Sequence, residues 1–91
     1  MVAVRQTFRI VNQLGLHARA ASVLAKLAGT FQSEITVEKD GQKARASSVI
    51  ELLLLCGQTG AEVTITARGQ DARAAVEAIG VLIADRFGEA N

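Results

Sequence analysis

The only histidine of the chain, His17, lies in the stretch "LGLHARAAS", which runs from Leu14 to Ser22. An alanine-rich helical pattern begins directly after it, and Arg19 follows two residues later. The first turn of a helix carries unpaired backbone N–H groups and the positive end of the helix dipole, so it stabilises anions. A neutral imidazole is also a nucleophile. If His17 attacks phosphorus, the amides of Ala18 and Arg19 and the Arg19 guanidinium would hold the phosphoryl oxygens.

Position alone leaves a second interpretation of His17 open, that of a polar residue tolerated in a loop before a helix. Other chemistries have less support. His17 and the single Cys56 are far apart in sequence and make a poor metal-ligand set. No second base is available to activate a serine, so a hydrolytic triad is not expected. We expect neither a metal nor a cofactor.

The 91 residues predict one small domain, residues 1–91, with a core of Val, Ile, Leu and Ala, because the chain has three Phe and no Trp or Tyr. The net charge is +1 and the charges are scattered, which argues against a nucleic-acid or membrane surface. Cys56 cannot form an internal disulfide, and the start "MVAVRQTFRI" lacks the apolar core of a secretory signal. A cytoplasmic protein is expected.

Alternating apolar residues predict four strands, at residues 4–10, in "SEITVEK", in "QKARA" and in "AEVTITARG", with a hairpin turn at Asp40–Gly41. Helical spacing predicts a helix from Ala18 to Ala28. A short second helix should follow the capping box of Ser48 and Glu51. A long last helix should begin after Asp71, a predicted N-cap, and end around Phe87 and Gly88.

This order predicts an α+β domain with a mainly antiparallel sheet and helices on one face, because four half-apolar strands need one covering layer. A ferredoxin-like domain that senses a small molecule has a compatible order of elements, but it would leave His17 and Arg19 unexplained. An RNA-binding sheet would need aromatic residues and a basic face, and the chain supplies neither.

The stretch "GLHARAAS" resembles the active-site signature of HPr, the histidine-containing phosphocarrier of the phosphoenolpyruvate-dependent phosphotransferase system. "SSVIELLLL" stands where that family has a second, serine-bearing motif. The resemblance implies an open-faced β-sandwich, in which three helices cover one face of a four-stranded antiparallel sheet. It also implies a carrier rather than a stand-alone enzyme. Phosphate would move from enzyme I to Nδ1 of His17 and then to IIA-type acceptors, as in sugar transport, with Arg19 and Ser48 matching the family's arginine and regulatory serine.

Several residues depart from the family pattern. Ala20 replaces the usual proline, and since alanine favours helix, we expect the helix and the activity to persist. Ser47, Glu51 and Cys56 replace the usual residues around the serine motif. We therefore expect Ser48 to act mainly as a helix cap, with a serine kinase the lesser alternative. "SSVIELLLL" looks more like the nitrogen-related branch, a regulatory phosphate relay, which remains the alternative function.

The apolar run from Val49 to Leu55 would surround a short helix, so its members cannot all face one core. Burial beneath the last helix is expected for Ile50 or Leu54. Whichever members are not buried should form a patch beside His17 for docking partners, with the candidates Val49, Ile50 and Leu53. Cys56 is expected to be a small buried hydrophobe. The chain is expected to act as a monomer.

Overall fold

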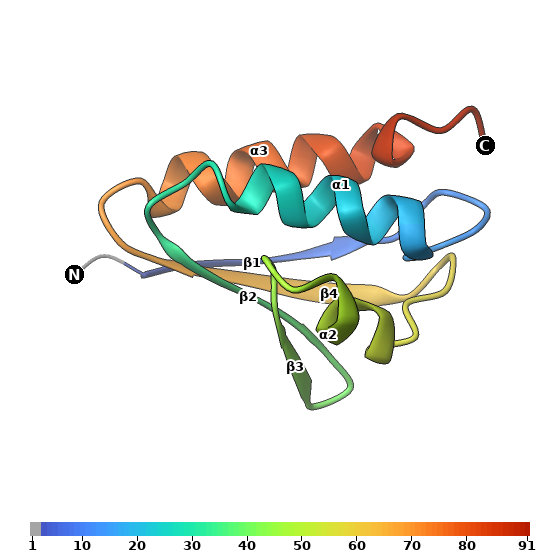
Figure 1. Ribbon diagram of the computed structural model, residues 1–91, viewed down its shortest axis with the longest axis horizontal. Helices are drawn as coiled ribbons and strands as arrows, with labels where there is room; N and C mark the ends of the chain where they lie inside the picture. Colours follow the sequence, from blue (N-terminus) through green and yellow to red (C-terminus); the bar gives the residue numbers. More distant parts are fainter. Residues whose placement is uncertain (1–2) are drawn as a thin grey trace.

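The computed structural model describes residues 3–91 and contains every predicted strand and helix (Figure 1). In chain order, the elements are β1 (Ala3–Arg9), α1 (Ala18–Ala28), β2 (Glu34–Lys39), β3 (Gln42–Arg45), α2 (Val49–Leu54), β4 (Glu62–Arg68), α3 (Ala72–Ala84) and a 3-10 turn, η1 (Arg86–Gly88). The predicted α+β open-faced sandwich is confirmed. Within residues 3–91, each helix is too short or too polar to cross a lipid bilayer.

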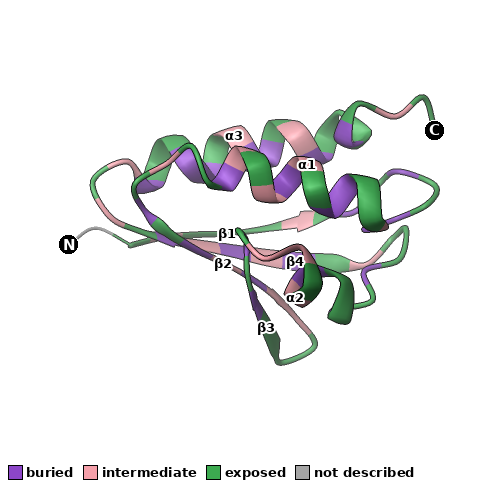
Figure 2. Cartoon of the chain, viewed as in Figure 1, coloured by how far each residue is buried: buried purple, intermediate pink, exposed green. Residues whose placement is uncertain are grey.

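The four strands form one antiparallel sheet in the order β1-β4-β2-β3. One face carries the inward residues, such as Val63, Ile65 and Ala67 of β4, and is buried (Figure 2). The opposite face is polar, and there the hydroxyls of Thr7 and Thr64 lie 2.9 Å apart across β1 and β4. The alternation in the sequence therefore separates a covered face from an open one.

Helices α1 and α3 lie side by side over the buried face of the sheet (Figure 1). The core between these layers is aliphatic, and its largest fully buried side chains include Ile10, Leu24, Leu52, Ile65 and Ile79. The short helix α2 packs against α1 and β3 rather than beneath α3. The expectation that the last helix covers α2 is therefore wrong.

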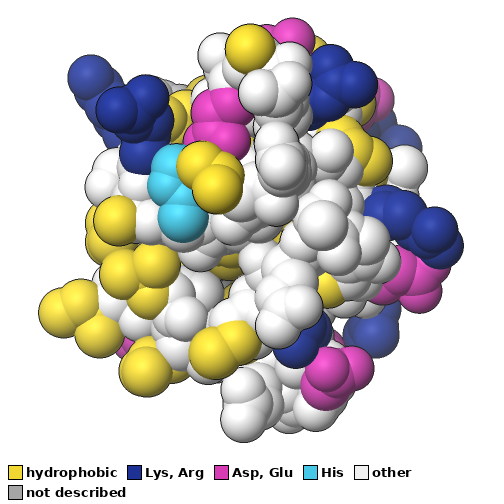
Figure 3. Space-filling view, turned by 90° about the vertical axis from the view of Figure 1, so that its right-hand side faces the viewer, with side chains coloured by type: hydrophobic (Ala, Val, Ile, Leu, Met, Phe, Trp, Pro, Cys, Tyr) yellow, Lys and Arg dark blue, Asp and Glu magenta, His cyan; other side chains and the backbone are white. Residues whose placement is uncertain are grey.

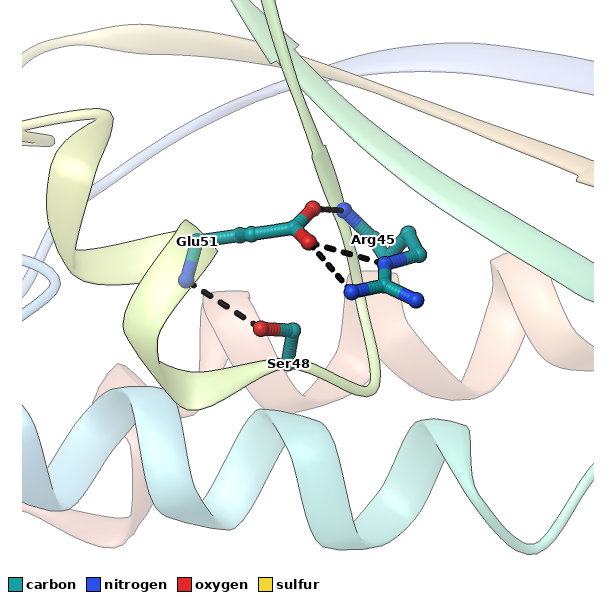
Figure 4. A network of polar contacts seen from close by, with 3 residues as sticks. All are labelled: Arg45, Ser48 and Glu51. Atoms are coloured by element: carbon teal, nitrogen blue, oxygen red, sulfur yellow. Dashed lines mark hydrogen bonds and ion pairs between the residues drawn. The ribbon is translucent and has the colours of Figure 1, made fainter.

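The predicted cap of α2 is present, but the capping box is only half formed. The amide of Glu51 donates to Oγ of Ser48 at 3.2 Å (Figure 4). The Glu51 carboxylate instead accepts hydrogen bonds from the amide, Nε and Nη2 of Arg45, at 2.8, 2.8 and 2.6 Å. These bonds lower the pKa of the Glu51 carboxyl and raise the pKa of Arg45. The ion pair links the end of β3 to the first turn of α2.

Asp71 precedes α3 as predicted, but its side chain does not cap this helix. Its carboxylate accepts hydrogen bonds from the amides of Gln32 and Ser33, at 2.8 and 2.9 Å, and from the hydroxyl of Ser33. The Ser33 hydroxyl and the Gln32 amide hold the pKa of Asp71 below its ordinary value. Asp71 therefore joins the α1–β2 connection to the start of α3.

Candidate functional site

The loop before α1 has a conformation that fixes where His17 lies. Gly15 has a φ of +68°, and a Cβ at this position would collide with the carbonyl of Gly57. The amide of Leu16 donates to that carbonyl at 2.7 Å, and the side chain of Asn12 donates to the carbonyl of Gly15 at 2.8 Å. Only glycine combines this φ with this close approach. The loop therefore delivers His17 to the start of α1 in an extended conformation.

His17 is the N-cap residue of α1, but its side chain makes no capping hydrogen bond. Its carbonyl accepts the first helical bond from Ala21 at 2.8 Å, while the imidazole is 28% exposed. The N–H groups of the first turn are thus left without a side-chain partner from the N-cap, as an anion site at a helix end requires. Arg19 is exposed and lines the same pocket as His17. The two predicted site residues are brought together.

Asn12 and its hydrogen-bond partner Glu89 are the residues of this site that the sequence reasoning missed. Oε2 of Glu89 is hydrogen-bonded to Nε2 of His17, and its Oε1 accepts a bond of 2.9 Å from Nδ2 of Asn12. The carboxylate is only 14% exposed. Its pKa is lowered mainly by the hydrogen bond from Asn12, then by that from His17, with a smaller contribution from the charge of Arg19. A carboxylate thus lies against one edge of the histidine ring.

The turn after α3 brings Glu89 to this position. Arg86, Phe87 and Gly88 have φ angles of +57°, +55° and +81°, and the side chain of Phe87 is buried. This left-handed turn directs the chain back toward the start of α1, where the amide of Gln13 donates to the carbonyl of Asn91 at 2.8 Å. Glu89 lies 72 residues from His17 in the sequence, so no local spacing connects them.

An apolar surface lies beside the histidine (Figure 3). We call it the apolar patch, and its members are the exposed side chains of Leu14, Ile50, Leu53 and Leu54. Burial within α2 differs from the expectation, because Ile50 and Leu54 are 73% and 69% exposed. Leu52 and Leu55 face the core instead, three residues apart on the side of α2 that meets α1 and β3.

Two further residues in or near α2 differ in burial from the prediction. Val49, a candidate docking residue, is half-buried and packs against the core. Cys56 is exposed rather than buried, and it follows the C-cap of α2 with a φ of +54°. Across residues 3–91, no group of three His, Cys, Asp or Glu side chains is arranged to hold a metal ion.

A histidine at an uncapped helix start, on an antiparallel sandwich, is an arrangement that suits a phosphocarrier, and comparison with known proteins gives the same class. The family described as "PTS HPr component phosphorylation site" matches residues 4–85. The chain is 45% identical over 91 residues to phosphocarrier protein NPr of Shewanella violacea, with both chains covered completely. It is 41% identical over 80 residues to phosphocarrier protein HPr of Cupriavidus necator, covering 88% of this chain and 90% of that one.

Solved structures agree with this assignment. The structure of HPr-C-His from Thermoanaerobacter tengcongensis superposes with a TM-score of 0.90 at 38% identity, and the match covers both chains completely. The chain belongs to the HPr family of the phosphotransferase system. It is therefore a phosphocarrier rather than a sensor domain.

Proposed function

We propose that His17 is the residue that carries the phosphoryl group, with Nδ1 as the nucleophile. The observation that carries this proposal is the position of the imidazole at the start of α1, where its side chain leaves the first-turn N–H groups uncapped. In the transfer, the bond between phosphorus and the donor breaks as the bond between phosphorus and Nδ1 forms. The amides of Ala18 and Arg19 stabilise the oxygens that arrive with phosphorus.

Arg19 is the second residue of this proposal. Its guanidinium is free to donate charge-assisted hydrogen bonds to the phosphoryl oxygens, because it is exposed and no carboxylate accepts from it within residues 3–91. The pocket that it shares with His17 supports this role. Arg19 would then act on the bound phosphoryl group more than on the fold.

The proposed partners are enzyme I as phosphoryl donor and IIA-type proteins as acceptors. The apolar patch, together with half-buried Val49 at its margin, is the proposed docking surface, since Ile50 and Leu53 lie on the exposed side of α2. A partner that covers apolar side chains next to His17 would also exclude water from the reacting phosphorus. The working form is proposed to be a cytoplasmic monomer of one domain, residues 1–91.

The test is incubation with phosphoenolpyruvate and enzyme I, followed by phosphorus NMR of the product. We expect one phosphohistidine on His17, labile in acid and stable in alkali. A His17→Ala variant should take up no phosphate and keep its fold. Phosphate uptake by that variant would overturn the proposal.

A regulatory relay of the nitrogen-related type is the second candidate. The exposed apolar side chains of α2 support it, since the resemblance to that branch rests on the same apolar run. Incubating the phosphorylated protein with sugar-specific and regulatory IIA domains would separate the two, because the physiological acceptor should take the phosphate faster.

A further inference from the structure

Three residues from distant parts of the chain form a connected set at the reacting ring: Asn12 in the loop after β1, His17 at the start of α1, and Glu89 after η1. Asn12 is completely buried, and its Nδ2 bonds both the carbonyl of Gly15 and Oε1 of Glu89, at 2.8 and 2.9 Å. The other carboxylate oxygen of Glu89 is hydrogen-bonded to Nε2 of His17. Both oxygens of Glu89 are therefore in use.

The chemistry of these groups fixes the direction of each bond. An ionised carboxylate only accepts hydrogen bonds, so the proton between Glu89 and His17 belongs to Nε2. In a neutral imidazole, the nitrogen without a proton is then Nδ1, and its lone pair is the one available to phosphorus. Assigning the proton to Nδ1 instead would leave two sets of lone pairs facing each other at Nε2.

We infer that Glu89 is a positioning residue for phosphoryl transfer, which holds the proton on Nε2 of His17 and thereby presents the Nδ1 lone pair to phosphorus. This inference rests on the proposed role of His17. Asn12 holds Glu89 in turn, so the ring, the carboxylate and the amide act as one unit. The arrangement follows the general rule that the hydrogen bond at one ring nitrogen sets the state of the other.

The step balances without a separate proton transfer. The Nδ1 lone pair forms the new bond to phosphorus, and the donor atom keeps the electron pair of the bond that breaks. The ring becomes positively charged, its proton stays on Nε2, and the Glu89 carboxylate offsets that charge. In transfer to an acceptor, the bond between Nδ1 and phosphorus breaks and its electron pair returns to Nδ1.

The need for two acceptor oxygens explains why a carboxylate stands at position 89. A glutamine has the same shape but one oxygen, so it would accept from His17 or from Asn12 and place an N–H group against the other donor. Asn12 cannot resolve this conflict by turning its amide, because its Nδ2 also serves the carbonyl of Gly15. Glu89→Gln should therefore behave as a defective variant rather than as a silent one.

The experiment uses ¹⁵N-histidine labelling of the whole chain, which gives a single pair of ring signals because His17 is the only histidine. In the unmodified protein at neutral pH, we expect Nδ1 to show the shift of an unprotonated nitrogen and Nε2 that of a protonated one. In Glu89→Ala, the averaged Nδ1 signal should move toward its protonated position. Transfer from enzyme I should also slow by about 10-fold, as when the partner of a functional histidine is removed.

Controls separate this role from stability. Glu77→Gln removes an exposed carboxylate of α3 and should leave both ring signals and the transfer rate unchanged. Glu89→Gln should shift the ring signals in the same direction as Glu89→Ala and should also slow transfer, because an amide N–H group that faces Nε2 favours the proton on Nδ1. An unchanged tautomer in Glu89→Ala would overturn the inference, and so would a changed tautomer with an unchanged transfer rate. If His17 took up no phosphate at all, the proposed function would fail while the tautomer measurement still decided the contact with Glu89.

Discussion

Gly80 of α3 lies directly against Phe8 of β1: a Cβ on Gly80 would be 2.5 Å from Cε1 of the Phe8 ring. Both residues belong to the interface between α3 and the sheet, where Gly80 is buried and Phe8 partly buried. Glycine here permits the close approach of helix and strand. A mid-helix glycine, which weakens an exposed helix, thus has a packing role.

Gly80→Ala should therefore lower the thermal stability. Overpacking costs about 1 to 3 kcal/mol, whereas the higher helix propensity of alanine returns at most about 1 kcal/mol. Gly29→Ala is the matched control, since Gly29 has a φ of −67° and a Cβ there would meet nothing closer than 3.5 Å. Thermal unfolding followed by circular dichroism measures both. Equal melting temperatures in the two variants would contradict the contact with Phe8.

Arg19→Ala should slow phosphoryl transfer while leaving the fold intact. The lost hydrogen bonds to a charged group are worth about 1.5 to 3 kcal/mol, which corresponds to roughly 10- to 100-fold in rate. Rapid-mixing measurements of transfer from enzyme I, with melting curves alongside, test this. Arg73→Ala, which removes an exposed arginine of α3, should change neither quantity. A parallel loss of rate and stability in Arg19→Ala would assign this residue to the fold instead.

A charge placed on the apolar patch should weaken docking more than it lowers stability. Ile50→Glu is the sharpest change, because this side chain is 73% exposed. We expect at least about tenfold weaker binding to enzyme I if Ile50 is a central contact. Val81→Glu on α3 is the control, since Val81 is 69% exposed and belongs to another helix. If both substitutions weakened binding to enzyme I equally, the proposal that the apolar patch is the docking surface would be contradicted.

Ser48→Ala should reduce stability and leave phosphorylation of His17 unchanged. Loss of an N-cap costs about 0.5 to 2 kcal/mol, and the amide of Glu51 loses its acceptor. Denaturant unfolding and transfer assays on the same sample measure the two effects, with Ser22→Ala, an exposed serine, as control. The Glu51 carboxylate in the first turn would repel a phosphate on Ser48. Efficient phosphorylation of Ser48 by a kinase, with slower transfer to His17, would restore the regulatory role.

Protonation of the Asp71 carboxylate should contribute to the loss of stability in acid. The pKa of this carboxyl is lowered from its ordinary value of 3.8 by its bonds to Ser33 and Gln32. The stability it contributes is therefore fully present above that value and is lost as pH falls through the lower pKa of the folded state. Asp71→Asn should show a smaller loss of stability below pH 3.8 than the unmodified protein. Identical pH dependence in the two proteins, measured by denaturant unfolding, would contradict these hydrogen bonds.

The elements could be predicted from the sequence because each carries its own periodic signal. The bounds of α1, Ala18–Ala28, agree with the apolar spacing, and the hairpin turns at Asp40–Gly41 as expected. Burial within α2 could not be predicted, since a helix of six residues that is apolar nearly all around contains no preferred face. The side of α2 that is buried is determined by its packing against α1 and β3.

The site was predictable only where it is local. His17, Ala18 and Arg19 are adjacent, so a helix-start signal places them together. Glu89 reaches the ring through a left-handed turn at Arg86–Gly88, and Asn12 reaches Glu89 from a loop closed by Gly15. No sequence pattern at either turn predicts the contact between Glu89 and His17, because that contact depends on how α3 lies on the sheet.

The hydrogen bond between the amide of Gln13 and the carbonyl of Asn91 has a practical consequence for any labelled form of the protein. A fluorophore or affinity tag attached after Asn91 would emerge at the rim of the pocket that contains His17, next to the proposed docking surface. Ala3 begins β1 at the opposite end of the molecule (Figure 1). Purification handles therefore belong ahead of β1, whereas a dye after Asn91 would report the arrival and departure of partners in real time.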